Sequence, residues 1–309
     1  MKQVRVALLG ATSHIAKGLI TYWSQRQDRE LFLFARSPER VLEFLTHFEP
    51  FRQEVFSIDQ FGKHQYDVVI NCVGIGSPQK LKDNLEDIFR VTSSFDDKVL
   101  AYLAGHPQTL YVNLSSGAAY GTDFSRPVDG QSQARININN LQAEEFYGIA
   151  KLHSEARHRA LPKLNIVDLR VFGYFSRYID LDEKFLLSEI ISCLKNKQML
   201  VTTPVDIRRD FVHPQDLVSL IDLCIARRTI NAVYDAYSHK EVSKFGILEF
   251  FAEAYGMEYT IDGSCRSLAV TGRKSCYYTI GRKAREIGYI PAFSSIEAIK
   301  DETSHILLS

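Results

Sequence analysis

The sequence lacks a long hydrophobic run: no stretch approaches the 18 apolar residues that a transmembrane helix needs. The first ten residues, MKQVRVALLG, also hold too short an apolar segment for a secretory signal peptide. An excess of one charge is missing as well, because 37 Lys and Arg balance 37 Asp and Glu. Without net charge, no overall basic field draws the chain to nucleic acid or to an anionic membrane. We therefore expect a cytoplasmic protein that binds neither.

Disulfide and metal motifs are also missing. The five cysteines are odd in number and form no CxxC pair, so reduced thiols are the simplest interpretation. The sequence has no HExxH segment, no Walker phosphate loop and no His/Cys cluster at metal-ligand spacing. We therefore expect no bound metal.

The sequence does contain short apolar runs that alternate with amphipathic helical patterns. Such an alternation predicts an α/β fold, with a doubly wound parallel sheet and helices on both faces. The expected strands cover residues 4–9, 31–34, 66–73, 109–114 and 164–172, and the expected helices include residues 15–25, 38–47 and 99–104.

The pattern becomes less regular after residue 175, where helices are expected near residues 185–195, 214–226 and 244–255. A chain of 309 residues is long enough for one large α/β domain and a smaller one. We therefore predict a large domain over residues 1–175 and a smaller C-terminal domain over residues 176–309, partly interleaved with the first.

The segment GATSHIAKG, residues 10–18, lies between the first strand and the first helix, where a dinucleotide-binding turn belongs. Such a site needs a tight turn and backbone amides aimed at a pyrophosphate at the positive end of a helix. Gly10 fits the usual glycine pattern, and the small residues Ser13 and Ala16 occupy the other two glycine positions. The alternative is a tight turn that binds nothing. The cofactor contacts expected here are Gly10, Thr12, Ser13, His14 and Ile15.

Two further segments extend this expected cofactor site. Arg36 and Ser37 follow the second strand, where an acidic residue usually selects NAD by binding the ribose 2′-hydroxyl. An arginine there suits a 2′-phosphate, so NADP(H) is the preferred cofactor and NAD(H) a possible one. The alternative is a solvated surface arginine. Asn71, Cys72 and Val73 end the third long strand and are placed in the cofactor cleft by position alone.

The segment YGIAK, from Tyr147 to Lys151, carries the sharpest chemical signal. Residues four apart on a helix face the same way, so one face presents a phenol and an ammonium together. The lysine charge can lower the phenol pKa from about 10, which makes the tyrosine a usable acid or base at neutral pH. A serine at the end of the upstream strand, Ser115 or Ser116, can donate to the reacting oxygen. The alternatives are a surface pair and a serine that only caps a turn.

Together these pieces resemble the extended short-chain dehydrogenase/reductases of the nucleotide-sugar epimerase/dehydratase group. The matching segments follow the family order and cover residues 10–18, 115–121, 147–151, 209–216 and 285–291. The resemblance implies an NADP-binding Rossmann domain over residues 1–175, a substrate-binding domain over residues 176–309, and a homodimer through helices around residues 91–104 and 147–159.

The same resemblance assigns roles to single residues. Ser116 would be the catalytic serine and contact the substrate, and Tyr147 would be the acid/base. Lys151 would be its partner, and both Tyr147 and Lys151 would contact the cofactor. Arg209 and Arg273 would bind the substrate diphosphate, since arginine carries a fixed charge and a bidentate fork.

Departures from the family pattern narrow the reaction. The 4,6-dehydratases carry an Asp-Glu pair directly after the catalytic serine or threonine, but Gly117 and Ala118 stand there. The resemblance therefore favours NADPH-dependent reduction of a nucleotide-linked 4-keto-6-deoxyhexose, for example dTDP-4-keto-6-deoxyglucose. The alternatives are a nucleotide-sugar 4-epimerase with tightly bound NAD, a reductase of other carbonyls, and a non-catalytic NADP-binding sensor. Gly173 replaces the usual asparagine after the late strand, which puts substrate contacts near it in question.

Overall fold

The computed structural model describes residues 3–48, 53–75, 85–183, 185–227, 229–264 and 274–307. Its centre is a seven-stranded sheet in the order β3-β2-β1-β4-β5-β6-β9, and every pair of neighbours is parallel. This confirms the Rossmann-type doubly wound sheet. The strands are β1 Val4–Leu9, β2 Arg29–Ala35, β3 Glu54–Ser57, β4 Val68–Asn71, β5 Leu110–Ser116, β6 Ile166–Val171 and β9 Asn231–Ala236.

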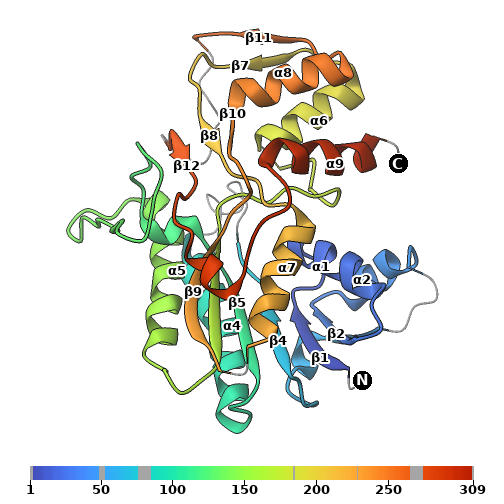
Figure 1. Cartoon of the computed structure of the whole chain (residues 1–309), viewed down its shortest axis with the longest axis vertical. Coiled ribbons are helices and arrows are strands. Elements are labelled where there is room, and N and C mark those ends of the chain that lie inside the picture. The colour runs from blue at the N-terminus through green and yellow to red at the C-terminus, as the bar shows by residue number, and fades with distance from the viewer. Residues whose placement is uncertain are drawn as a thin grey trace.

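Helices cover both faces of this sheet, as Figure 1 shows. Alternate residues of β1 point to opposite sides: Val6 and Leu8 join one apolar core, and Ala7 and Leu9 join the other. The helices α1 His14–Ser24, α2 Pro38–Leu45 and α7 Pro214–Ile225 contribute to the first core. The helix α4 Leu85–Gly105 contributes to the second, and α5 Ala143–Arg159 packs against α4.

Local sequence signals set several helix ends. Ser13 is the N-cap of α1 and accepts a hydrogen bond from the Ala16 N–H at 3.3 Å. Pro38 and Pro214 open α2 and α7, where the missing N–H of proline costs nothing. These caps explain why α1, α2 and α7 lie close to the helices expected there. Helix α4, in contrast, was expected only over residues 99–104 and begins at Leu85.

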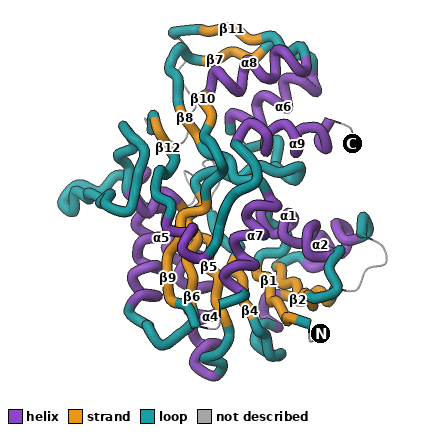
Figure 2. The backbone as a smooth tube through the Cα atoms, viewed as in Figure 1, coloured by secondary structure: helices purple, strands orange, loops and turns teal. Residues whose placement is uncertain are grey.

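A third apolar core lies beyond the carboxyl edge of the sheet. The elements that enclose it appear at the top of Figures 1 and 2. It is built from α6 Leu186–Asn196, α8 Lys244–Tyr255 and α9 Ser295–Leu307, beside the two-stranded sheet of β7 Leu200–Thr202 and β11 Tyr259–Ile261. A three-stranded sheet lies between the seven-stranded sheet and this core. Its strands are β8 Arg208–Arg209, β10 Val242–Ser243 and β12 Cys276–Tyr277.

The chain after residue 175 contributes both to the core around α6, α8 and α9 and to the seven-stranded sheet with its flanking helices. Helix α7 packs on α1, and β9 adds the last strand to the large sheet beside β6. The expected elements did not include β3, β9 or α9. Strand β3 is a four-residue edge strand with no buried residue, so its sequence shows little apolar patterning.

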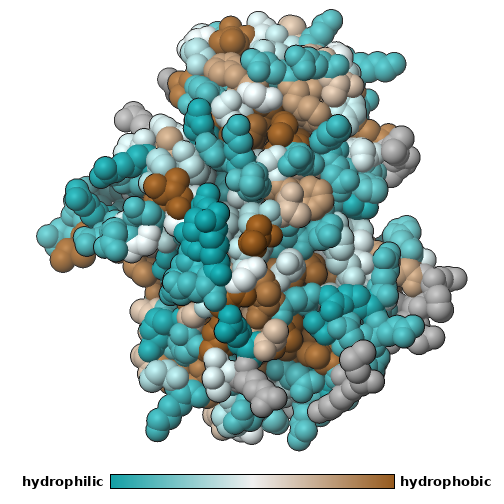
Figure 3. All heavy atoms as spheres, in the orientation of Figure 1, coloured by the Kyte–Doolittle hydropathy of each residue, from teal (hydrophilic) through white to brown (hydrophobic). Residues whose placement is uncertain are grey.

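The outer surface on the face shown in Figure 3 is mainly hydrophilic, with hydrophobic side chains scattered between polar ones. Among the described residues, no helix combines the length and the apolar character needed to cross a membrane.

Candidate active site

The turn after β1 has the shape that a dinucleotide-binding loop requires. Gly10 adopts φ +78°, and a Cβ there would lie 3.0 Å from Val73 Cγ2 and 3.2 Å from the Cys72 backbone. The positive φ and the close approach both call for glycine. The Ser13 N–H donates to the Gly10 carbonyl at 2.9 Å, which closes the turn at the start of α1. The loop therefore presents the N-terminus of α1 at the carboxyl edge of the sheet, which fits a pyrophosphate.

The His14 side chain packs against an aromatic neighbour. Its ring stacks edge-on against Tyr174 with centroids 4.9 Å apart, and Nε2 is buried. Burial lowers the pKa of His14 to about 4. A contribution of His14 to a pyrophosphate would therefore come from its backbone N–H, like those expected of Thr12, Ser13 and Ile15.

The other expected cofactor residues lie around the same loop. Arg36 is exposed and Ser37 half-buried directly after β2, beside β1 in the sheet. Asn71 ends β4, and its side-chain oxygen accepts a hydrogen bond from the Val73 N–H at 3.0 Å. The Cys72 N–H donates to the Leu9 carbonyl at 3.0 Å. The structure thus gathers the three predicted cofactor segments at one edge of the sheet.

Ser115 and Ser116 face opposite ways, which distinguishes the two candidates. The Ser115 hydroxyl donates to Glu155 at 2.5 Å, and Glu155 is paired with Arg170. Ser115 is therefore engaged with α5. Ser116 is 7% exposed, is the N-cap of the short helix η2 Gly117–Tyr120, and accepts a hydrogen bond from the Ala118 N–H at 3.2 Å.

Helix α5 carries Tyr147 and Lys151 and packs against η2, the short helix that Ser116 caps. A Cβ at Gly148 would overlap the Ala118 carbonyl oxygen, so α5 touches η2 at the residue after Tyr147. Lys151 is buried, and its Nζ donates to the Leu114 carbonyl at 2.8 Å. The same Nζ lies 5.7 Å from the centre of the Tyr147 ring. Lys151 thus lies on the same side of α5 as the Tyr147 ring, as the YGIAK spacing predicts, and it reaches the end of β5.

Lys151 also faces the cofactor segment after β4. Its Nζ lies 3.7 Å from the position that a Cβ would take at Gly74. Burial raises the pKa of the neighbouring Cys72 thiol, while the Lys151 charge opposes that rise. Lys151 therefore stands between the proposed cofactor cleft and Tyr147.

Tyr277 adds a second hydroxyl beside Ser116, and no motif in the sequence points to it. Its hydroxyl lies 3.1 Å from Ser116 Oγ, and the residue is 7% exposed. Its ring packs edge-on against Phe124, with centroids 4.6 Å apart. Tyr277 lies 161 residues after Ser116, and no spacing rule links the two positions.

Two cations lie over the Tyr277 ring. The Arg209 guanidinium lies 5.9 Å from the ring centre, because Tyr277 and Arg209 are partners in the β12–β8 pairing. The Lys274 ammonium lies 4.7 Å from the same ring. Burial, together with repulsion from Arg209, lowers the pKa of Lys274 to about 8. Arg209 thus lies beside Tyr277, whose hydroxyl meets Ser116, whereas Arg273 lies outside the described residues.

Close packing explains why position 173 holds a glycine and not the family's usual asparagine. A Cβ at this position would overlap the Asp210 carbonyl oxygen and approach Phe211 to 3.2 Å. The segment after β6 therefore packs too tightly against the 210–212 segment to hold an asparagine, and the Val212 N–H donates to the Gly173 carbonyl at 3.0 Å.

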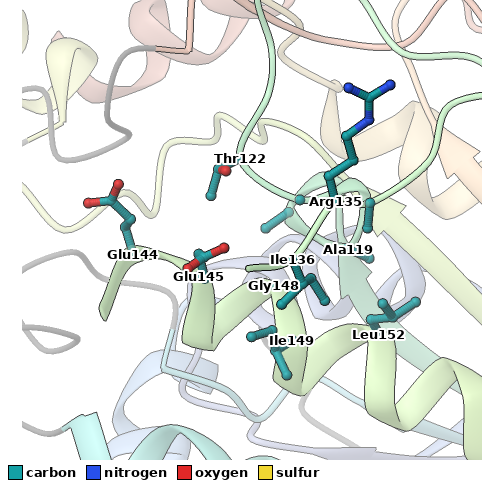
Figure 4. Close-up of a pocket in the computed structure, with 12 residues that line it drawn as sticks. Ala119, Thr122, Arg135, Ile136, Glu144, Glu145, Gly148, Ile149 and Leu152 are labelled. Atoms are coloured by element: carbon teal, nitrogen blue, oxygen red, sulfur yellow. The ribbon is translucent and has the colours of Figure 1, made fainter. Parts of the chain in front are cut away.

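A small hollow lies beside α5, and Figure 4 shows its lining. Gly148, Ile149 and Leu152 form its floor, and Arg135 and Ile136 lie across from them. Its volume is about 20 Å³, room for about one water molecule. This hollow is too small to be a sugar site.

One group of three potential metal ligands exists among the described residues: His213, Asp301 and Glu302. The Gln215 N–H donates to His213 Nδ1 at 3.1 Å, so Nε2 carries the proton and donates to Asp301 at 3.1 Å. Arg177 pairs with Glu302 at 2.7 Å. This group is therefore a hydrogen-bonded cluster that joins α7 to α9.

Solved structures of several enzymes share the whole fold. A UDP-glucose 4-epimerase from Stenotrophomonas maltophila with bound NAD is 16% identical, covers 99% of this chain and 98% of its own, and gives a TM-score of 0.81. A UDP-glucuronic acid 4-epimerase from Bacillus cereus with NAD is 15% identical, covers 99% of this chain and 99% of its own, and gives a TM-score of 0.79. A dTDP-glucose 4,6-dehydratase from Bacillus anthracis with NAD is 13% identical, covers 99% of this chain and 97% of its own, and gives a TM-score of 0.77. At such identities the likeness shows the fold alone.

The sequence itself carries the family assignment. A search among curated proteins finds no match to the chain. The family model described as the NAD dependent epimerase/dehydratase family matches residues 6–237, which include the glycine turn, Ser116, Tyr147, Lys151 and Arg209. With this match over most of its length and the site just described, the chain belongs to the NAD dependent epimerase/dehydratase family.

Proposed function

We propose that this chain reduces a nucleotide-linked 4-keto-6-deoxyhexose, such as dTDP-4-keto-6-deoxyglucose, at the expense of NADPH. The observation that carries the proposal is the packing of α5, which holds Tyr147 and Lys151, against η2, where Ser116 is followed by Gly117 and Ala118. The three side chains suit hydride chemistry at one carbon. The two small residues stand where a dehydratase would need carboxylates, so elimination has no acid/base pair there.

The cofactor proposal rests on the loop and on Arg36. The tight Gly10 turn would hold the pyrophosphate at the N-terminus of α1, with Asn71, Cys72 and Val73 beside it. The exposed Arg36 after β2 would bind a ribose 2′-phosphate, a charge-assisted contact that favours NADPH over NADH. When bound, the nicotinamide supplies the hydride.

The residues of the chain would then divide the remaining work. The Tyr147 phenol would give its proton to the new alkoxide while the Ser116 hydroxyl donates a hydrogen bond to the same oxygen. The Lys151 charge, fixed by its bond to the Leu114 carbonyl, would stabilise the phenolate that Tyr147 leaves behind. Arg209 would bind the substrate diphosphate, with Arg273 as a second contact.

A nucleotide-sugar 4-epimerase is the second candidate. The same three side chains serve oxidation and reduction at one carbon, so epimerisation needs no group that the site lacks. The two candidates differ in cofactor use: a reductase consumes NADPH, whereas an epimerase returns its bound NAD unchanged in each cycle.

The test is NADPH oxidation by the purified protein across a panel of dTDP-, GDP- and UDP-linked 4-keto sugars, with the matching 4-hydroxy sugars assayed for interconversion. We expect NADPH oxidation with at least one 4-keto sugar. Tyr147→Phe keeps the ring and should lower kcat about 100- to 10,000-fold while NADPH affinity stays nearly unchanged. Interconversion of 4-hydroxy sugars without NADPH use would replace the reductase by the epimerase. A Tyr147→Phe protein at the parental rate would overturn both.

A further inference from the structure

The hydrogen bonds of Ser116 leave its proton with two possible directions. A serine hydroxyl has one proton and two lone pairs. The Ala118 N–H fills one lone pair of Ser116 Oγ at 3.2 Å, and the Tyr277 hydroxyl lies 3.1 Å from the same oxygen. If Ser116 donated to Tyr277, its proton would no longer be free for a reacting oxygen. If Tyr277 donates to Ser116, both lone pairs are filled and the serine proton must point elsewhere.

The chemistry of Tyr277 favours the second arrangement. A phenol is a stronger acid than an aliphatic alcohol, so it is the better donor of the two. Tyr277 is 7% exposed, and its burial raises the pKa of the phenol, so the hydroxyl keeps its proton at neutral pH. The buried phenol is therefore a permanent donor beside the serine.

The Tyr277 ring is held in one place, so this donor is fixed. Phe124 packs edge-on against it, and Phe172 lies 5.3 Å away between ring centroids. The Arg209 and Lys274 cations lie over the ring at 5.9 and 4.7 Å from its centre. Backbone pairing of β12 with β8 sets the register of the whole segment.

We propose that Tyr277 is a positioning residue for Ser116: its phenol donates to Ser116 Oγ and so directs the serine proton to the oxygen that reacts. This inference rests on the proposed function, in which Ser116 donates to the substrate. It also gives the segment after residue 273, remote in the chain from β5, a defined part in the catalytic step.

The test is a double-mutant cycle of Ser116→Ala and Tyr277→Phe, with NADPH and dTDP-4-keto-6-deoxyglucose or the best substrate of the panel. Tyr277→Phe alone should lower kcat on the order of tenfold, the worth of one hydrogen bond, with little change in KM. In the Ser116→Ala protein the same substitution should lower kcat no further, because Tyr277 acts only through the serine.

Tyr289→Phe is the matched control. Its hydroxyl donates to the Tyr237 carbonyl at 2.8 Å in a fully buried place, with no link to Ser116. The control should lose stability, measured by urea unfolding, without loss of kcat. The cycle on the free energy of unfolding gives a second readout that needs no substrate: the two substitutions should be less than additive.

The outcomes separate the two proposals. If Ser116→Ala and Tyr147→Phe both leave kcat unchanged, the proposed function is wrong and the role of Tyr277 falls with it. If Ser116→Ala lowers kcat but Tyr277→Phe lowers it equally in both backgrounds, or not at all, only the Tyr277 inference is overturned. If Tyr277→Phe raised only KM, Tyr277 would be a substrate contact, and the positioning role would also be overturned. Fully additive unfolding energies would show that the two hydroxyls are not bonded.

Discussion

Arg36 is the residue on which the cofactor proposal depends, because it is the exposed cation directly after β2. If it binds the 2′-phosphate, Arg36→Ala should weaken NADPH binding by about 1.5–3 kcal/mol, the usual worth of a charge-assisted hydrogen bond. NADH has no phosphate at that position, so its affinity should hardly change. Fluorescence titration of both cofactors measures the difference.

Lys240→Ala provides the control for a general loss of positive charge. Lys240 is exposed and lies between β9 and β10, away from the cofactor turn. Its replacement should leave both affinities unchanged. Equal losses for NADPH and NADH in Arg36→Ala would contradict the assignment of the 2′-phosphate to Arg36.

At the scale of elements, the contact between α5 and η2 sets the distance from Tyr147 to Ser116. Gly148 allows this contact, because a Cβ would overlap the Ala118 carbonyl oxygen and backbone would have to move. Gly148→Ala should therefore destabilise the fold by about 1–3 kcal/mol, as overpacking does. It should also lower kcat, because the shift separates the phenol from the serine. Urea unfolding and turnover measure the two effects.

Gly105, at the end of α4, is the matched glycine for this comparison. A Cβ there would meet no atom within 4 Å, and its φ is not positive. Gly105→Ala should be neutral or slightly stabilising, with kcat unchanged. If Gly148→Ala behaved in the same way, the close approach of α5 to η2 would not control the site.

A network of hydrogen bonds and ion pairs also joins α5, β5, β6 and η2 next to the site. Glu155 on α5 accepts from Ser115 on β5 and pairs with Arg170 on β6 at 2.5 Å. The Arg170 guanidinium lies 4.4 Å from the centre of the Tyr120 ring in η2. Because Glu155 is buried and paired, removing Arg170 would leave a buried carboxylate uncompensated. The end of β5, helix α5 and η2 are thus held by the same network.

For the molecule as a whole, His158 makes stability depend on pH. It is fully buried on α5, between Asp168 at 2.8 Å and Asp96 at 2.7 Å. Burial favours the neutral ring, but the hydrogen bonds to the two carboxylates outweigh it and raise the pKa of His158 to about 9. Protonated His158 therefore stabilises the fold. This contribution is complete below about pH 6.5 and is lost as pH rises through about 9.

The comparison of wild type with His158→Gln isolates this contribution. The gap in their free energies of unfolding should shrink by roughly 2–3 kcal/mol between pH 6.5 and pH 9. Burial lowers the pKa of Lys274 to about 8, so this residue makes stability rise with pH. Because both proteins contain Lys274, the difference between their free energies of unfolding cancels this trend. His153→Gln, at an exposed position of the same helix, controls for loss of an imidazole and should show no such change. A constant gap for His158→Gln would contradict the charged bridge.

The local sequence determined much of this protein. Each strand of the sheet's centre is a short apolar run, and Val4–Leu9 is observed as predicted. The glycine turn and the YGIAK spacing also act within a few residues, since turn geometry and helix periodicity are local properties. The parallel sheet, the turn at its carboxyl edge and the Tyr147–Lys151 pair therefore follow from the amino-acid sequence alone.

Only the tertiary structure decided the rest, because it depends on contacts between residues distant in the chain. The choice between Ser115 and Ser116 rests, apart from the family pattern, on which one meets Glu155 and which one meets Tyr277. Strand β9 joins the sheet through pairing with β6, not through a strong pattern of its own. Tyr277 reaches Ser116 because β12 pairs with β8, and no periodicity spans 161 residues. Local propensity thus predicts elements, whereas long-range packing assembles the site.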